Sequence, residues 1–218
     1  MKKPFSAWKV GAPYYLPLLA LGFGTIAYAG AQSYFYLYPS MIALLPGLFV
    51  LNFFRDPERT ITTNPAEIVS PADGMIVEVA DLEDSPHYDG PCKRISIFLN
   101  VFNVHVNRAP DECTIARIDY KEGAYKNAMS PEAGQLNEAN TIRLDTPHGS
   151  MTVRQIAGLI ARRIVCIPSS GDTLQKGEKF GMIKFGSRTE LYLSTDAEIL
   201  VVPKQKVEGG STVLARFP

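Results

Sequence analysis

Charged side chains are missing from a long N-terminal part of this 218-residue chain. No Asp, Glu, Lys, Arg or His occurs between Val10 and Phe54, and all 22 acidic residues lie at or after Asp56. A soluble domain does not usually tolerate so long an uncharged stretch, because most charged side chains belong on its hydrated surface. The absence therefore indicates that this part of the chain lies in a membrane.

The chain also has few cysteines and no excess of basic residues. The three cysteines, Cys92, Cys113 and Cys166, are odd in number and widely spaced. Their number and spacing favour a reduced compartment over a disulfide framework and lack a paired zinc motif, so we interpret them as buried thiols and predict no metal site. The formal net charge is zero, and nothing in its distribution suggests a nucleic-acid-binding protein.

The uncharged block predicts a membrane hairpin over residues 1–54. It divides into two apolar stretches, Ala12–Ala29 and Tyr34–Phe54, each close to the roughly 20 residues that a membrane-spanning helix needs. Four prolines within the block leave two possibilities open, a hairpin that spans the bilayer and one that only embeds in one leaflet.

Basic residues flank this hairpin on both sides. Lys2, Lys3 and Lys9 precede it, and Arg55 and Arg59 follow it. Because positively charged flanks remain on the cytoplasmic side, we expect both ends of the hairpin and the catalytic domain in the cytoplasm, at the cell (inner) membrane.

Residues 55–218 predict a mostly β domain of the α+β class with a barrel-sandwich-like arrangement, because short strand-like runs alternate with glycine-rich turns. We expect one uninterrupted strand over 94–108, and further strands over 114–120, 139–145, 181–185 and 189–193. Isoleucines at helical spacing predict a short helix over 157–165. This helix would present Arg162 and Arg163, either to a substrate phosphate or to solvent.

Two side chains in this domain are candidates for acid–base chemistry. Asp73 lies in the turn Ser-Pro-Ala-Asp-Gly, and His105 lies on the polar face of the strand predicted over 94–108. Each also has an ordinary interpretation, the aspartate as a turn residue and the histidine as a hydrogen-bonded surface group. His87 and His148 fall in loops, where we expect them to be solvated.

The pair Gly186-Ser187 carries the most specific chemistry in the sequence. A serine hydroxyl that follows a glycine can attack the carbonyl on its own N-terminal side, because glycine leaves the approach open and tolerates a twisted backbone. Elimination of the resulting ester would cut the chain and convert Ser187 into a pyruvoyl group. The alternative is an ordinary turn.

Five motifs occur in order after the hairpin: Phe-Phe-Arg-Asp-Pro-Glu-Arg, Ser-Pro-Ala-Asp-Gly, Phe-Asn-Val-His-Val-Asn-Arg-Ala-Pro, the segment 156–167, and Lys-Phe-Gly-Ser-Arg. Together they resemble the phosphatidylserine decarboxylases of the short, archaeal type. The resemblance implies a proenzyme that cuts itself between Gly186 and Ser187 into a β chain, 1–186, and an α chain, 187–218. These two chains would form a heterodimer that binds phosphatidylserine in the membrane. The resemblance leaves further oligomerisation open.

The resemblance also implies the site residues. Asp73 and His105 match the family's Asp and His that activate the serine, here Ser187. The covalent pyruvoyl would form a Schiff base with the substrate amine and accept the electrons released with CO₂, and His105 would return a proton. Long-type members carry a second histidine where Arg108 stands, and an Asp where Asn103 stands. This difference leaves one imidazole for both tasks, or assigns one task to another residue.

Two other functions remain open on the sequence. One is a barrel-sandwich carrier or binding module whose prosthetic group would be attached to Lys184. The other is a pyruvoyl-dependent decarboxylase of a soluble amino acid, although the apolar N-terminus favours a lipid substrate.

Overall fold

The computed structural model describes residues 5–32, 35, 37–130, 132–159, 163–184 and 186–218. Within it the chain divides into a helical unit, Ser6–Pro57, and a β-rich unit that contains Glu58–Pro218. The cleavage-site pair and the candidate acid–base residues all belong to the β-rich unit.

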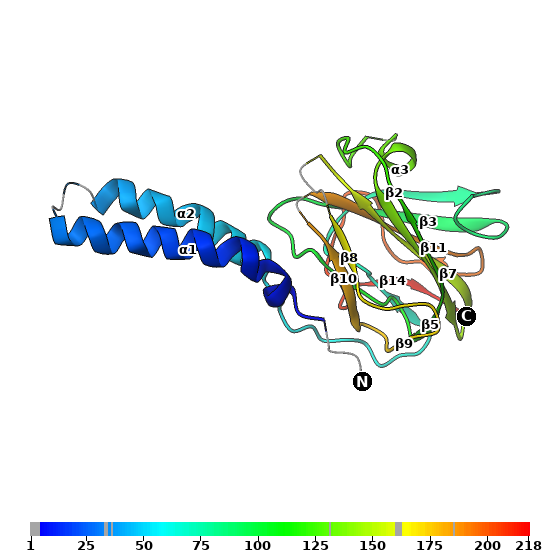
Figure 1. Ribbon diagram of the computed structural model, residues 1–218. Coiled ribbons are helices and arrows are strands. Elements are labelled where there is room, and N and C mark those ends of the chain that lie inside the picture. The colour runs from blue at the N-terminus through cyan, green and yellow to red at the C-terminus, as the bar shows by residue number, and fades with distance from the viewer. Residues whose placement is uncertain (1–4, 33–34, 36, 131, 160–162, 185) are drawn as a thin grey trace. The chain divides into compact units, whose positions relative to one another are not determined.

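The helical unit consists of two helices that run in opposite directions (Figure 1). α1 spans Ala7–Gln32 and α2 spans Leu37–Phe53, and the Ser40 hydroxyl of α2 donates a hydrogen bond to the Thr25 carbonyl of α1 at 3.2 Å. Only α1 is long and apolar enough to cross a membrane among the described residues. With 17 residues, α2 is about 25 Å long, shorter than a hydrocarbon core of about 30 Å.

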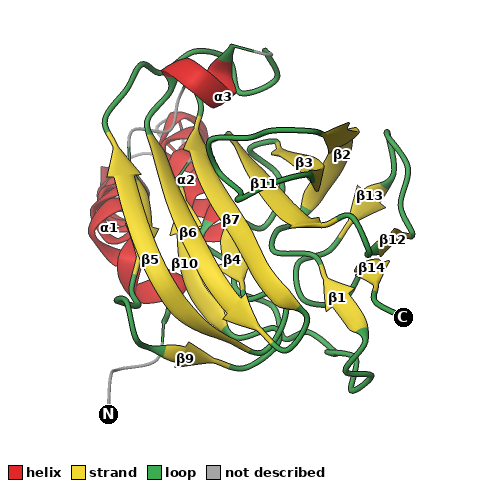
Figure 2. Ribbon diagram, turned by 90° about the vertical axis from the view of Figure 1, so that its right-hand side faces the viewer, coloured by secondary structure: helices red, strands yellow, loops and turns green. Residues whose placement is uncertain are grey.

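The β-rich unit contains three antiparallel sheets (Figures 1 and 2). The large sheet has the order β13-β2-β3-β11-β7-β6-β5-β9, and the two small sheets have the orders β4-β10-β8 and β1-β14-β12. The bounds are β1 Glu67–Val69, β2 Gly74–Leu82, β3 Cys92–Leu99, β4 Val106–Arg108, β5 Cys113–Lys121, β6 Ala139–Thr146, β7 Gly149–Ala157, β8 Ile164–Cys166, β9 Thr173–Leu174, β10 Lys179–Ile183, β11 Ser187–Ser194, β12 Glu198–Ile199, β13 Lys206–Val207 and β14 Val213–Arg216. A one-turn helix, α3, spans Ala133–Leu136.

The hydrophobic core joins one face of the large sheet to the two small sheets. Alternate residues of the large sheet's strands are buried in it, since side chains at every second position share a face. This core contains Ile95, Ile97 and Leu99 of β3, Met151 and Val153 of β7, and Leu191 and Leu193 of β11, together with Ile68, Phe180 and Leu214 of the small sheets. The same face of β11 begins with Ser187 and Thr189, so the core becomes polar at that end.

Several sequence predictions are confirmed. The domain is mostly β with an apolar N-terminal helix, and the strands predicted over 114–120, 139–145 and 189–193 correspond to β5, β6 and β11. The strand predicted over 181–185 overlaps β10, which ends at Ile183; Phe185 lies outside the described residues.

Two predictions were wrong. The strand expected over 94–108 is interrupted at residues 100–105, because the Asn100 and Asn103 side chains accept hydrogen bonds from nearby amides and form a turn. The helix expected over 157–165 is not formed in the described part of that segment. Ala157 ends β7 and Ile164 begins β8, so their amide and carbonyl groups pair with neighbouring strands.

Candidate active site

The Gly186-Ser187 bond lies where the chain passes from one sheet to another. β10, in a three-stranded sheet, ends at Ile183, and Ser187 begins β11 of the large sheet. Gly186 has a φ of 69°, in the left-handed region that glycine adopts without steric cost. The bond is therefore followed by a fixed strand and preceded by a residue whose backbone conformation suits glycine.

The Ser187 side chain is completely buried. Its exposed fraction is 0%, and its hydroxyl has no hydrogen-bond partner among the described residues. Because an unsatisfied buried hydroxyl costs about 1–3 kcal/mol, a structural serine would usually have a partner. The backbone of Ser187 pairs with Leu99 of β3 and Ala157 of β7, which holds the residue from both sides.

His105 contacts the residue that precedes Ser187. Its Nδ1 lies 3.0 Å from the Asn103 carbonyl, and the Gly186 amide donates to its Nε2 at 3.3 Å. A carbonyl only accepts hydrogen bonds, so Nδ1 carries the proton, and the electron pair of Nε2 accepts the hydrogen bond from the Gly186 amide. The imidazole is fully buried and presents this basic nitrogen to the Gly186-Ser187 segment.

Asp73 lies in a buried turn that packs against β4. Its Oδ1 accepts a hydrogen bond from the Gly209 amide at 2.8 Å, and its Oδ2 pairs with Arg59 at 2.7 Å. The same turn contacts β4, where the Asn107 side chain and the Arg108 amide both donate to the Pro71 carbonyl. The aspartate is thus fixed in a turn that contacts the strand following His105.

A chain of buried amide side chains extends from this turn to β11, and the sequence analysis missed it. Asn107 donates to the Thr189 hydroxyl at 3.2 Å, Gln155 donates to Asn107 at 2.9 Å, and Asn140 donates to Gln155 at 3.0 Å. Thr189 lies on the same face of β11 as Ser187, two residues further along. These bonds fix the polar end of the core, on the side to which Ser187 points.

A cavity of about 280 Å³ reaches the cleavage site. Its lining is mainly apolar and consists of Phe98, Asn100, Val101, Asn127, Ala128, Leu159 and Gly186. Exposed apolar side chains neighbour these residues in the chain, since Phe102 is 67% exposed and Met129 is 53% exposed. The cavity therefore offers apolar surface beside the Gly186 backbone.

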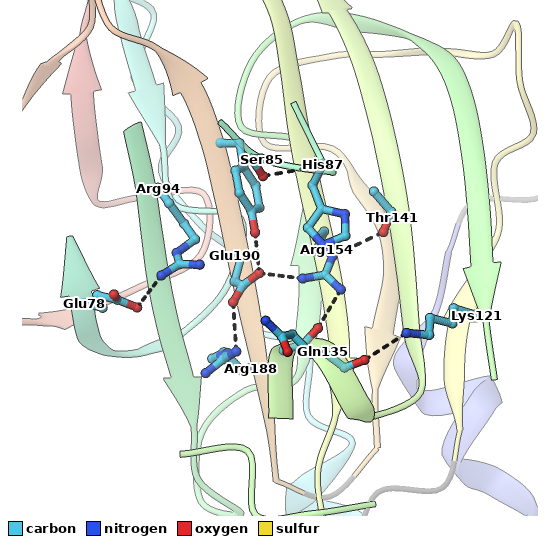
Figure 3. Close-up of polar contacts among 12 residues, drawn as sticks. Glu78, Ser85, His87, Arg94, Lys121, Gln135, Thr141, Arg154, Arg188 and Glu190 are labelled. Carbon is cyan, nitrogen blue, oxygen red and sulfur yellow. Dashed lines mark hydrogen bonds and ion pairs between the residues drawn. The ribbon is translucent and has the colours of Figure 1, made fainter. Parts of the chain in front are cut away.

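A buried charged cluster lies on the other face of β11. It consists of Arg188, Glu190 and Tyr192 of β11 and Arg154 of the neighbouring β7. Figure 3 shows Arg154, Arg188 and Glu190 with their neighbours. The Glu190 carboxylate binds Arg154 at 2.8 Å and Arg188 at 2.9 Å, and it accepts a hydrogen bond from the Tyr192 hydroxyl at 2.8 Å. Burial alone would raise the pKa of Glu190, but the two arginines and the hydrogen bond hold it below its usual value. Burial, with Glu190 nearby, raises the pKa of Tyr192 to about 12.

Of the remaining candidate residues, Arg163, Arg108 and Lys184 belong to the described part of the chain. Arg162 lies outside the described residues, and Arg163 is exposed, although its carbonyl accepts a hydrogen bond from the Lys184 amide. Arg108, at the position of the second histidine in long-type proteins, donates to the Gly177 carbonyl at 3.0 Å. Lys184 is only 7% exposed.

His87 and His148 are not the solvated residues that their loops suggested. His87 packs against the edge of the Tyr192 ring, and burial lowers its pKa to about 4. His148 pairs with Asp111 at 2.9 Å and stacks on Phe217. In each case a distant segment covers a loop residue, which the local sequence does not reveal.

The three cysteines are thiols without disulfide partners. Cys92 and Cys113 are buried and Cys166 is partly buried. Burial raises the pKa of Cys113 to about 12 and that of Cys166 to about 11. These values keep both thiols protonated and unreactive at neutral pH.

Comparison with known proteins gives a consistent family. A family profile described as phosphatidylserine decarboxylase matches residues 47–215. The phosphatidylserine decarboxylase proenzyme of Carboxydothermus hydrogenoformans is 44% identical over 218 residues, covering 100% of this chain and 99% of that protein. The proenzyme of Magnetococcus marinus is 41% identical over 202 residues, 92% of each chain. A Neisseria meningitidis proenzyme is 46% identical over 172 residues, 78% of this chain and 64% of the relative.

Proposed function

Since this chain belongs to the phosphatidylserine decarboxylase family, we propose that it converts phosphatidylserine to phosphatidylethanolamine after cutting itself between Gly186 and Ser187. One observation carries the proposal: a buried serine hydroxyl without a described partner follows a glycine whose amide is bound by a histidine. This arrangement has no evident structural purpose, but it suits attack by the serine on the preceding carbonyl.

The cleavage proceeds in three balanced steps. The Ser187 oxygen adds to the Gly186 carbonyl carbon, the C–N bond breaks, and the hydroxyl proton ends on the freed amine, which leaves an ester. A base then removes the Ser187 α-proton, and the Gly186 carboxylate departs from the β-carbon. The resulting enamine tautomerises to an imine, and water replaces its nitrogen to give ammonia and the pyruvoyl group.

His105 is the base that we assign to this sequence. Its Nε2 is unprotonated and accepts a hydrogen bond from the Gly186 amide, so a basic nitrogen contacts the residue whose carbonyl Ser187 would attack. Asp73 would act at longer range, through the turn that packs on β4, by favouring the protonated imidazole electrostatically.

The surroundings of residue 187 fit a pyruvoyl group. The Ser187 hydroxyl lies on the inner face of β11 and has no hydrogen-bond partner among the described residues. Its oxygen can therefore be lost without leaving a described donor unsatisfied. The group supplies an electron sink for the decarboxylation. His105 then holds the proton that the α-carbon of the product needs.

The cavity beside Gly186 supports a lipid substrate. Its lining of Phe98, Val101, Ala128 and Leu159 suits acyl or glycerol carbons, and Asn100 and Asn127 can hydrogen-bond to the head group. Arg163 borders the segment that precedes Gly186 through its bond to Lys184, so we keep it, with Arg162, as a candidate for the phosphate. The burial of Lys184 argues against the carrier alternative, because a carrier lysine must reach other enzymes.

The two products of cleavage would remain together as a heterodimer. After a cut at Gly186 the α chain 187–218 begins with β11, which pairs with β3 on one side and β7 on the other. The same chain ends with β14, which pairs with β1. Separation would expose buried residues of both chains.

The apolar helix and the basic flanks support a location at the cell (inner) membrane with the catalytic part in the cytoplasm. α1 is long enough to cross a bilayer. Lys2 and Lys3 before α1, Lys9 in its first turn and Arg55 after α2 are the basic residues that this orientation requires.

Intact mass and activity test the proposal together. Purified wild-type protein should separate under denaturing conditions into fragments 1–186 and 187–218, the second with a carbonyl that borohydride reduces and no free N-terminal amine. It should release CO₂ from phosphatidylserine in detergent micelles. Ser187→Ala should remain one chain without activity. Full activity of an uncut chain, or a fragment that begins with an ordinary serine, would refute the mechanism.

A further inference from the structure

The backbone of Gly158 lies directly against the carbonyl that Ser187 would attack. A methyl group at position 158 would lie 2.2 Å from the Gly186 oxygen and 3.1 Å from its carbonyl carbon. Carbon atoms do not approach backbone oxygens so closely, so only glycine is compatible with this position of the carbonyl. Gly158 follows β7, whose last residue, Ala157, pairs with Ser187.

The segment around Gly158 cannot easily retreat. The Ala157 carbonyl accepts a hydrogen bond from the buried Asn137 side chain at 2.7 Å, and the Ala157 amide donates to the Glu138 carbonyl at 2.9 Å. The same methyl group would also meet the Ala128 side chain at 3.2 Å. A side chain added at position 158 would therefore displace the Gly186 carbonyl rather than shift the backbone of residue 158.

We propose that Gly158 is a positioning residue for self-cleavage, which keeps the Gly186 carbonyl within reach of the Ser187 hydroxyl. The proposal rests on the proposed cleavage at this bond. Attack requires the reacting atoms to be about 3–3.5 Å apart and correctly aligned, and a displacement of about 1 Å can cost 10²-fold in rate. A methyl group at position 158 is expected to cause a displacement of this order.

The test is the processing rate of Gly158→Ala in the full-length chain. We expect it to cut at least about 100-fold more slowly than wild type. Hydroxylamine, which cleaves esters, should release no additional fragment 1–186, because the block precedes ester formation. Unchanged unfolding of Gly158→Ala combined with Ser187→Ala, relative to Ser187→Ala alone, would show that the fold is intact.

The double variant Gly158→Ala, Ala128→Gly provides the specific control. Removal of the Ala128 methyl group opens space behind the new side chain, so the double variant should cut faster than Gly158→Ala. Because Ala128 also lines the cavity beside Gly186, Ala128→Gly alone supplies the reference rate for the double variant. If Gly158→Ala does not fold, the double variant provides the test, and we expect its rate of self-cleavage to be lower than that of Ala128→Gly. Cutting of Gly158→Ala or the double variant at the rate of its parent would overturn the inference, as would a hydroxylamine-sensitive ester that accumulates. An uncut wild type would instead refute the proposed function.

Discussion

We expect the proposed self-processing to depend on the basic nitrogen of His105. His105→Ala should leave folded proenzyme that cuts about 10²–10⁴-fold more slowly, the usual contribution of a well-placed base. Asp73→Asn should slow cutting less, because the carboxylate acts through its charge. A gel time course of newly made protein measures both rates.

His148→Ala is the matched control for this prediction. Its imidazole pairs with Asp111 and stacks on Phe217, and neither contact involves Gly186 or Ser187. The variant should therefore cut at the wild-type rate. Normal cutting of His105→Ala, or loss of cutting in His148→Ala, would assign the base elsewhere.

His87 makes the stability of the domain depend on pH. Burial disfavours the charged ring and lowers the pKa of His87 in the folded protein to about 4, whereas the ordinary pKa of a histidine is 6.5. Between these values the unfolded chain binds a proton that the folded chain does not, so this contribution to stability is full above pH 6.5 and is lost as the pH falls towards 4.

The corresponding measurement is denaturant unfolding of the uncut Ser187→Ala protein from pH 8 to pH 5. His87→Gln in the same background should show a smaller loss of unfolding free energy over that range. Parallel pH curves for the two proteins would mean that His87 is protonated in the folded state and is not buried as described.

At the scale of a single element, the two faces of β11 differ in character. Ser187 and Thr189 lie on the inner face, whereas Arg188, Glu190 and Tyr192 belong to the charged cluster on the other face. Figure 3 shows Arg188 and Glu190 of this cluster. Because the strand would become the start of the α chain, its side-chain bonds to β7 and to the Ser130 carbonyl would hold the new chain end in place.

Glu190→Gln should destabilise the domain strongly. The substitution removes the charge that compensates Arg154 and Arg188, and breaking a buried ion pair from one side costs roughly 3–5 kcal/mol. Tyr192→Phe removes one hydrogen bond to the same carboxylate and should cost only about 1–3 kcal/mol. Unfolding of both variants in the uncut background gives the comparison; equal losses would contradict the electrostatic explanation.

The elements differ in how well their sequence predicts them. β6 alternates buried apolar residues with more exposed polar residues over most of its length, as expected of a strand with one buried face. β11 also alternates, with Leu191 and Leu193 on one face and Glu190 and Tyr192 on the other, but both of its faces are buried. The turn after β3 was missed because Asn100 and Asn103 bond their own backbone in a run that otherwise resembles a strand. The isoleucine spacing after β7 predicted a helix, but strand pairing determines the described structure there.

The site was predictable only as far as its chemistry is local. Gly186, Ser187, His105 and Asp73 are recognisable as residue types in short motifs. Other features of the site join separate segments of the chain, and no local pattern encodes them. They are the ion pair between the Asp73 carboxylate and Arg59, the hydrogen bond between Asn107 and Gln155, and the approach of Gly158 to Gly186. Asp73 and His105 therefore remain predicted roles that the processing experiments test.

For the whole molecule, the helical unit bears on where the enzyme works. Its outward side chains are apolar all round rather than on one stripe, as Leu21 on α1 and Ile42 on α2 are more than 60% exposed. An exposed surface of this kind is unfavourable in water and favourable in lipid. The substrate named for the relatives is itself a lipid, which a membrane-bound enzyme can reach without extracting it far into water.

We therefore expect the full-length protein to stay in the membrane fraction when membranes are washed with alkaline carbonate. Carbonate releases peripheral proteins, whereas α1 is long and apolar enough to cross the bilayer. Protease added to inverted inner-membrane vesicles should digest the β-rich unit, whereas protease outside intact spheroplasts should not, since the basic flanks retain both ends in the cytoplasm. Release by carbonate would reduce the hairpin to a peripheral anchor. Digestion of the β-rich unit in spheroplasts would show that the orientation is the reverse.

If α2, with its 17 residues, only dips into the leaflet, the two ends of the hairpin would instead lie on opposite sides of the membrane. A tag before Lys2 would then be cleaved in spheroplasts, while the β-rich unit remained protected.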